Sequence, residues 1–525
     1  MSGSPHSLES ASTPCSKTLG MVLMSEQAPC TEPCTDAGTD PSDPKGDPRT
    51  APHVESPSGS ASSRRCAVVG LGARARLFTQ ALAGPYADGV DLVGFCDVNA
   101  HRMAVHNDWL TADHPGRAPV PAYAAEDFDL MLRRERVDLV VVCSVDRTHD
   151  DYIVRALDAG CDVVTEKPMT TDADRARRIL AARQRSGREV RVAFNYRYNP
   201  VHSAVRELIA AGEIGEVGSV HFEWLLDLRH GADYFRRWHR DKADSGGLMV
   251  HKATHHFDLV NWWLGTEPET VFAQGGLFFY GDEAGGRRGL ARPYTRAHGS
   301  PSAGDDPFAV HLADSPVLSA LYLDAEAEDG YHRDQNVFGP GVSIEDDMAV
   351  LVRYASGASL TYHLTAYAPW EGYRVAFNGS EGRLELLVEE STWSRPEASP
   401  EARTEAGAGA HPGVRTEARS GGRTGGGSAV LHGTVVGDEA GRTELLLRRH
   451  WERPREVKVP TGEGGHGGGD VRMLQDLFGP RRSAPDPLGR AADALDGAKS
   501  LVTGLAANES FVTGAPVRAR DLLDV

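Results

Sequence analysis

Long hydrophobic runs are missing from this sequence. The most apolar stretches, such as residues 139–143, have the length of a buried strand and fall far short of the ~18 residues of a membrane helix. Residues 1–6 lack the basic region and apolar stretch of a secretion signal. We therefore expect no membrane partner and a cytoplasmic location.

Cysteine and positive charge are also scarce. The seven cysteines form neither a paired metal-ligand spacing nor a dense disulfide framework. Lys and Arg number 56 against 74 Asp and Glu, and the resulting net charge of -18 disfavours a polyanionic partner. We expect no metal site and no nucleic-acid partner.

The length of the chain predicts more than one domain. Its 525 residues exceed the roughly 250–300 at which a single hydrophobic core stops growing. Residues 1–62 are rich in Ser, Pro, Thr, Gly and Asp, which predicts a disordered extension. Residues 63–190 and 191–525 differ in hydrophobic pattern, which predicts two folded domains. Within the second, residues from about 395 to 428 contain too few apolar residues for a folded element, which predicts a flexible insertion.

Residues 63–190 alternate between apolar strands and helix-length segments. The expected strands are 66–69, 90–96, 137–143 and 161–165. Strands that alternate with helices predict right-handed crossovers and a doubly wound parallel sheet.

Residues 191–525 show a different strand pattern, in which apolar and polar residues alternate. The alternation is clear at 220–226, 348–354 and 360–364, and residues 378–382 favour a hairpin turn into 384–388. A helical pattern returns near 501–507. The fold class is therefore α/β, with an N-terminal Rossmann domain and a C-terminal α+β domain whose sheet is largely antiparallel and open.

A glycine motif follows the first expected strand. Residues 68–75, VVGLGARA, contain G-x-G-x-x-A between a strand and a helix. Gly70 permits the tight turn, Gly72 lets the backbone approach a pyrophosphate, and Ala75 allows close packing. The context predicts a dinucleotide site.

Asp97 ends the second expected strand, where a carboxylate can accept hydrogen bonds from adenosine ribose hydroxyls. Because a carboxylate repels a 2′-phosphate, the sequence favours NAD. NADP stays an alternative, since Arg74 or Arg102 could pair with the phosphate.

The motif TEKP at 165–168, together with the glycine loop, resembles the glucose-fructose oxidoreductase/inositol dehydrogenase (Gfo/Idh/MocA) family. The resemblance extends through 144–149, 195–200, 212–217 and 508–510, and covers roughly residues 64–395 and 466–525. It implies a homo-oligomer, dimer or tetramer. The cofactor-binding residues expected from motif and resemblance are Gly70, Gly72, Ala73, Arg74, Asp97, Ser144, His149, Glu166 and Lys167.

The resemblance also implies two catalytic residues. Lys167 hydrogen-bonds the reacting hydroxyl in that family and assists proton transfer. Residues 246–258, GGLMVHKATHHFD, match the family's helix that carries an aspartate and, four residues later, a histidine. By that match His255 is the general base, an imidazole suited to neutral pH.

This helix departs from the family pattern at His251, which stands where the family most often has aspartate. The spacing places His251, His255 and Asp258 on one helical face, so Asp258 is an alternative orienting carboxylate. Two histidines four residues apart are also half of a zinc site, which Glu223 or Asp227 could complete, but the usual third-ligand motif is missing.

Substrate-binding residues are expected where aromatic and hydrogen-bonding groups mix, as they do in sugar and polyol sites. Our candidates are Asn195, Arg197, His251, Arg333, Trp370 and Tyr373.

The predicted function is that of an NAD(P)-dependent oxidoreductase acting on a CH–OH group, the secondary alcohol of a sugar, inositol or related polyol. Two alternatives stay open. One is a lyase or glycosidase that oxidises a sugar transiently and keeps its NAD, and the other is a non-catalytic dinucleotide or sugar sensor.

Overall fold

The computed structural model describes residues 63–394, 441–459, 465–480 and 486–524. The expected extension at 1–62 and the expected insertion at about 395–428 lie outside these residues. No helix in the described part of the chain has the length and apolar character needed to cross a lipid bilayer.

The first domain is built on a six-stranded parallel sheet, as predicted. Its central strands are apolar, as in Leu-Val-Val-Val of β4, and are buried on both faces because helices cover both sides. The strand order along the sheet is β3 (Ala122–Ala124), β2 (Val90–Asp97), β1 (Arg64–Val69), β4 (Leu139–Val142), β5 (Asp162–Thr165) and β6 (Val190–Val192). The short edge strands β3 and β6 were not predicted.

Helices cover both faces of this sheet. Three helices pack on one face, α3 (Phe128–Arg134), α4 (His149–Asp158) and α5 (Ala173–Ser186). The other face carries α1 (Ala75–Ala83) and α2 (Ala100–Asp113). The glycine loop joins the end of β1 to α1, so it lies at the carboxyl edge of the sheet. Ligands of doubly wound folds bind at this edge.

The second domain contains the predicted largely antiparallel sheet, which has nine strands in the described residues. All its pairings are antiparallel except that of β7 with β10. The strand order is β14 (Arg455–Glu456), β13 (Arg442–Arg449), β12 (Gly382–Ser391), β11 (Glu371–Gly379), β7 (Val217–Asp227), β10 (Ser359–Ala368), β9 (Asp347–Tyr354), β8 (Pro268–Gly276) and β15 (Val517–Arg518). The predicted hairpin at 378–382 is the β11–β12 turn.

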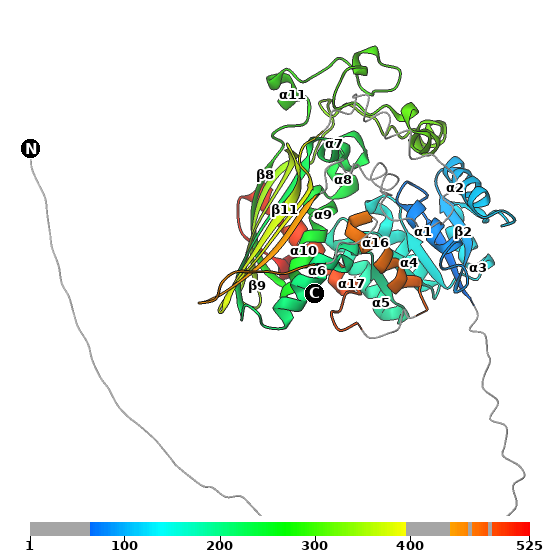
Figure 1. Ribbon diagram of the computed structural model, residues 1–525. Coiled ribbons are helices and arrows are strands. Elements are labelled where there is room, and N and C mark those ends of the chain that lie inside the picture. Colours follow the sequence, from blue (N-terminus) through cyan, green and yellow to red (C-terminus); the bar gives the residue numbers. More distant parts are fainter. Residues whose placement is uncertain (1–62, 395–440, 460–464, 481–485, 525) are drawn as a thin grey trace, which may run out of the picture. The chain divides into compact units, whose positions relative to one another are not determined.

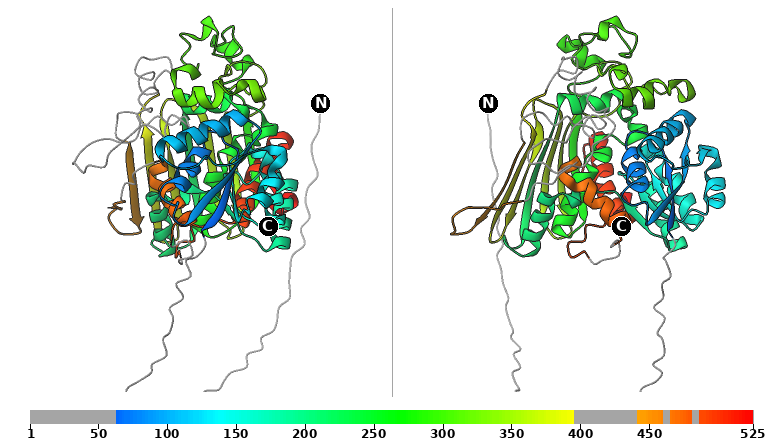
Figure 2. Two further views of the ribbon diagram at one scale, coloured as in Figure 1. Left: turned by 90° about the vertical axis from the view of Figure 1, so that its right-hand side faces the viewer. Right: turned by 45° about the vertical axis from the view of Figure 1, so that its right-hand side comes forward.

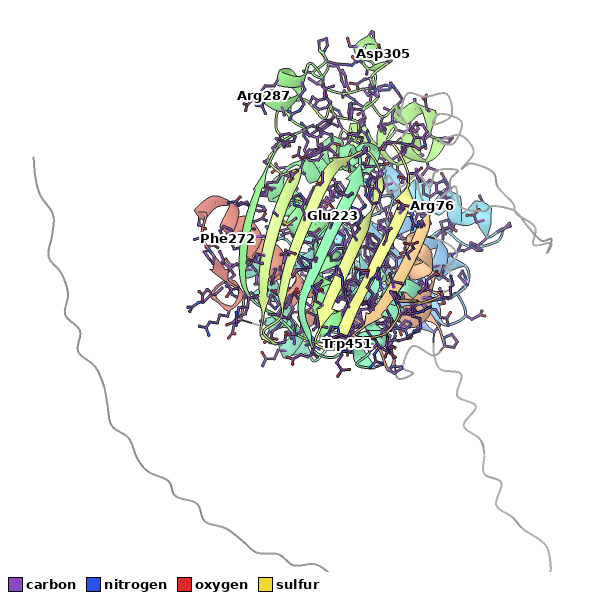
Figure 3. All side chains as sticks on the ribbon, turned by 60° about the vertical axis from the view of Figure 1, so that its left-hand side comes forward. Arg76, Glu223, Phe272, Arg287, Asp305 and Trp451 are labelled. Atoms are coloured by element: carbon purple, nitrogen blue, oxygen red, sulfur yellow. The ribbon has the colours of Figure 1, made fainter. Side chains whose placement is uncertain are left out.

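Alternation along β7 decides which face of this sheet is buried. Val220, Phe222, Trp224 and Leu226 point into the core, and Glu223 lies on the opposite face. Figure 3 shows that opposite face with Glu223 near its middle and no helix across it. The buried face carries α6 (Pro200–Ala210), α7 (Leu228–Arg236), α9 (Leu248–His251) and α10 (Thr254–Leu264).

C-terminal helices join the two sheets (Figures 1 and 2). Helix α17 (Ala494–Thr513) begins at a capping box of Asp493 and Asp496, and it contributes side chains to the cores of both domains. Helix α16 (Gly469–Phe478) packs against α1. The described part of the chain also contains α8 (Lys242–Ser245), α11 (Asp282–Arg288), α12 (Pro316–Leu318), α13 (Glu326–Asp329) and α18 (Ala519–Leu522).

Candidate active site

The glycine loop has the geometry that a dinucleotide diphosphate requires. Gly70 has a φ of +81°, and a Cβ added there would lie 2.4 Å from the backbone nitrogen of Ser144 at the end of β4. A Cβ added to Gly72 would meet only the hydroxyl of Tyr322, 3.6 Å away. The backbone at Gly72 is therefore open enough for a phosphate to approach, while Gly70 cannot be replaced without moving β4.

Asp97 lies beside this loop, as the sequence predicts. Its carboxylate accepts hydrogen bonds from the backbone N–H groups of Leu71 and, at 2.8 Å, of Asn99. Burial raises the pKa of Asp97, and Arg102 approaches the carboxylate to 3.9 Å. The residue is thus placed at the adenosine end of the expected cofactor site.

Lys167 follows β5 and is held at the carboxyl edge of the parallel sheet. Its Nζ donates to the backbone oxygen of His251 at 3.1 Å and lies 3.4 Å from His251 Nε2. Burial lowers the pKa of Lys167 to about 8, although the nearby Asp146 carboxylate opposes this shift. An amine with this pKa can exchange a proton near neutral pH.

His251 is paired with a carboxylate that the sequence analysis missed. His251 Nδ1 lies 2.5 Å from Oδ2 of Asp146, and both side chains are buried. Burial lowers the pKa of His251 well below its usual value. A neutral ring that donates from Nδ1 to Asp146 has its Nε2 lone pair directed toward the Lys167 ammonium.

A carboxylate–histidine pair is therefore present, but it joins Asp146 to His251 and not to His255. Asp146 lies in the short 3₁₀ turn Asp146–Thr148 after β4, inside the segment 144–149 that carries the resemblance. The feature of the sequence that could have identified Asp146 is its position between Ser144 and His149, two residues that are expected at the cofactor site.

The predicted single helix through residues 246–258 is interrupted. Helix α9 ends at His251 and α10 begins at Thr254, and the three side chains contact different partners. Asp258 forms a buried pair with Arg197, at 2.6 and 2.8 Å, and does not orient a histidine. His255 stacks on Tyr196 with ring centroids 4.2 Å apart.

Further residues predicted at the cofactor site form a polar network beneath the loop. Arg74 pairs with Glu166 at 2.5 Å and with Asp470 at 3.1 Å. Asn195 donates to the same Asp470 carboxylate at 2.8 Å. Asp470 on α16 thus connects Arg74 to Asn195, and Arg74 in turn pairs with Glu166.

Ser144 and His149 frame the turn that precedes α4. The Nδ1 and Nε2 atoms of His149 lie 2.9 and 3.0 Å from the backbone oxygens of Pro168 and Ser144. The buried ring therefore connects the turn after β4 to the segment that carries Lys167.

Three predicted substrate residues contact partners other than Lys167 and His251, and Arg333 among them lies 5.4 Å over the ring of Tyr322. Arg333 forms a buried pair with Asp233 at 2.8 Å. Tyr373 is buried beneath the nine-stranded sheet, where its hydroxyl lies 2.7 Å from His202 Nε2. Trp370, at the start of β11, lies under the guanidinium of Arg374.

A second polar layer lies behind His251. His230 Nδ1 lies 2.6 Å from Glu371, and His230 Nε2 lies 3.2 Å from the Tyr234 hydroxyl. The Tyr234 ring is edge-on to His251 at 5.7 Å. Burial raises the pKa of Glu371 to about 7. Glu371 is next to Trp370, which was predicted to bind substrate. No motif in the sequence links Glu371 to His230.

The zinc alternative does not fit this geometry. His251 is engaged by Asp146, and Glu223 lies on the open face of the nine-stranded sheet, where it pairs with Arg374. Within the described residues, no three His, Cys, Asp or Glu side chains are grouped as metal ligands.

Comparison with known proteins identifies the class. The model of the Gfo/Idh/MocA oxidoreductase family, NAD-binding Rossmann fold, matches residues 64–194, and that of the family's C-terminal alpha/beta domain matches 206–517. The chain therefore belongs to the Gfo/Idh/MocA family of oxidoreductases, as the resemblance implied.

Particular relatives narrow the comparison. YteT of Bacillus subtilis, which is named as an oxidoreductase, is 35% identical over 480 residues, covering 87% of this chain and 98% of the relative. The inositol 2-dehydrogenase of Rubrobacter xylanophilus is 32% identical over 156 residues, 29% of this chain and 40% of the relative. The WlbA dehydrogenase of Bordetella pertussis, solved in complex with NADH and UDP-GlcNAcA, superposes with a TM-score of 0.53 at 17% identity. The match covers 87% of this chain and 97% of that one.

Proposed function

We propose that this protein transfers hydride between NAD and a secondary alcohol of a sugar, inositol or related polyol. The observation that carries the proposal is the position of Lys167, a buried amine with a pKa near 8 at the carboxyl edge of the Rossmann sheet. A bound nicotinamide would supply the hydride acceptor. The chain's own residues would then bind the alcohol and take up its proton.

Lys167 would contact the reacting hydroxyl. An ammonium has three N–H donors, and His251 offers acceptors for two of them, its backbone oxygen and Nε2. The third is available to a substrate oxygen. Asp146 and His251 hold the amine in place. In its neutral form the amine can take the hydroxyl proton, and His255 stays the predicted general base that finally accepts it.

Sugar-like substrates suit the surroundings of this amine. The His239 ring lies 4.2 Å from that of His251, and Trp238 stacks on His239. Aromatic rings beside buried hydrogen-bonding groups are typical of sites that bind polyols. The relative named as an inositol 2-dehydrogenase and the WlbA complex with a nucleotide sugar support this substrate class.

A spectrophotometric screen of inositols, aldoses and sugar acids with NAD tests the function. We expect NADH to form with at least one of them. Titration with NADH and NADPH would accompany the screen, and failure of the chain to bind either dinucleotide would overturn the proposal.

We expect NADH to bind at least about tenfold more tightly than NADPH, a difference of about 1.4 kcal/mol. Asp97 and Asp329 both lie close to Arg102, and Arg74 is engaged by Glu166 and Asp470, so a 2′-phosphate would meet carboxylates without a free arginine. Fluorescence titration measures the ratio. Asp97→Asn should bring the affinities for NADH and NADPH closer together. Asp91→Asn, at the exposed start of β2, is the matched control. Equal affinities in the unchanged protein would contradict the assignment of NAD.

The pH dependence of alcohol oxidation should follow Lys167. A protonated amine cannot accept a proton, so kcat/KM should rise with pH through about 8 and then level off. The Asp146 carboxylate raises the pKa of Lys167, so Asp146→Asn should move this rise to lower pH, by on the order of one unit. Asp151→Asn, at an exposed position on α4, should leave the profile unchanged. A rise that stays in place in Asp146→Asn would show that Asp146 does not act on the titrating group.

An oligomer of this chain would use the open face of the nine-stranded sheet (Figure 3), which the described helices leave uncovered. This proposal follows the family resemblance, and light scattering of the purified protein tests it.

A further inference from the structure

A segment of the second domain lies against the dinucleotide site of the first. Residues 310–331, here called the clasp, belong to the long connection between β8 and β9 and contain α12, a π-helical turn (Ser319–Leu323) and α13. Figures 1 and 2 show this green connection beside α2 of the Rossmann domain.

The clasp is attached by an apolar core of its own. Leu312, Leu318, Leu321 and Tyr322 are buried together with Ala73 of the glycine loop and Val105 of α2. This cluster is separate from the cores of the two domains. The contact is therefore a packed interface between the clasp and the cofactor-binding elements.

The clasp also makes a polar contact with the glycine loop. The Tyr322 hydroxyl accepts a hydrogen bond from the backbone N–H of Ala73 at 3.0 Å, and it is the atom nearest to the open side of Gly72. Backbone N–H groups of this loop are those that bind a diphosphate in Rossmann domains. A tyrosine hydroxyl can donate as well as accept, so it can turn its proton toward a phosphate oxygen.

A second set of contacts surrounds the adenosine end. Arg102, which approaches Asp97, pairs with Asp329 of the clasp at 2.7 Å and donates to the backbone oxygen of Leu321 at 3.0 Å. Asn99 donates to the backbone oxygen of Ala325 at 3.0 Å. The clasp thus contacts the neighbours of both cofactor-recognition elements, the glycine loop and Asp97.

We propose that the clasp is a second wall of the dinucleotide site, in which Tyr322 hydrogen-bonds the cofactor's diphosphate and the Arg102–Asp329 pair controls passage of the adenosine half. This inference rests on the proposed NAD-dependent function. Because the wall comes from the substrate domain, the dinucleotide can leave only after the clasp separates from α2. Release of the dinucleotide after each turnover is therefore slow and limits the rate of the reaction.

Stopped-flow fluorescence of the full chain tests the clasp, with NADH as the probe and excess NAD as the displacing ligand. Tyr322→Phe should weaken NADH binding and accelerate its dissociation about tenfold, because one hydrogen bond to the diphosphate is lost. Asp329→Asn should raise the association and dissociation rates together and leave Kd within about twofold, as expected when a barrier is lowered for passage in both directions.

Two variants serve as matched controls. Tyr294→Phe removes a hydroxyl in the same long connection that bonds to Asp306, and Asp324→Asn changes an exposed carboxylate of the clasp. Both should leave the rates unchanged. Thermal unfolding of each variant checks that the fold is intact.

The possible results distinguish a failure of the clasp proposal from a failure of the proposed function. NADH that binds with the same rates to Tyr322→Phe and Asp329→Asn as to the unchanged chain would overturn the clasp alone. Tighter NADH binding by Tyr322→Phe would also overturn it, because the hydroxyl would then compete with the diphosphate. Absence of NADH binding by the unchanged chain would overturn both the clasp and the proposed function.

Discussion

Replacing Lys167 by methionine should reduce kcat/KM for the oxidised alcohol by about 10³-fold or more, within the range of a lost acid–base group. Methionine is similar in length to lysine but can neither donate to the substrate hydroxyl nor exchange a proton. NADH should still bind, because the glycine loop and Asp97 are untouched. Steady-state kinetics and NADH titration measure the two effects.

Lys458→Met is the matched control, because this lysine is 83% exposed beside β14. Near-normal turnover of Lys167→Met on the true substrate would refute the proposed mechanism. His255→Ala should also lose turnover if His255 is the base. If His255→Ala is active and His251→Ala is not, the base would instead be the histidine that Asp146 orients.

Replacing Arg197 by alanine should lower the free energy of unfolding by about 3–5 kcal/mol, as expected when one partner of a buried ion pair is removed. The guanidinium and the Asp258 carboxylate are both almost fully buried, so Asp258 would be left without its charge partner and would have to stay charged in an apolar site or take up a proton. Denaturant unfolding followed by fluorescence or circular dichroism measures the change.

The decrease in the free energy of unfolding caused by Arg197→Ala should be larger at neutral than at acidic pH. Burial raises the pKa of Asp258 to about 6 even with Arg197 present, and removal of the arginine raises it further. The folded variant then binds a proton more readily than the unfolded chain, so its stability falls as pH rises through the folded pKa. The double variant Arg197→Met, Asp258→Leu should recover much of the loss.

A raised KM with unchanged stability in Arg197→Ala would contradict the structural role. It would return Arg197 to the substrate-binding role that the sequence analysis expected. Arg229→Ala, at the half-buried start of α7, is a comparison for the loss of an arginine near the surface.

Local patterns accounted for most of the fold. Continuous apolar runs identified β1, β2, β4 and β5, and alternation identified β7, β9 and β10, because these periodicities depend on which faces of a strand are buried. The edge strands β3 and β6 have three residues each, too few to show a period. The interruption between α9 and α10 was missed because spacing alone fits a continuous helix.

The candidate site was predictable only where its residues belong to local motifs. The glycine loop, Asp97 and the Glu166–Lys167 pair each follow a recognisable strand. Asp146 and Tyr322 do not belong to such a pattern, and their partners lie 105 and 249 positions away in the chain. A search by residue spacing does not reach pairs of this kind.

The sequence by itself therefore determined the two domains' architecture, the dinucleotide motif and the position of the lysine at a strand end, because each is written in residues close together along the chain. Only the tertiary structure decided that Asp146 supplies the carboxylate for His251, that Asp258 belongs to Arg197, and that the clasp lies on the glycine loop. The physical reason is that buried charges and hydrogen-bonding groups must be paired, and that the fold decides which distant partner comes within reach.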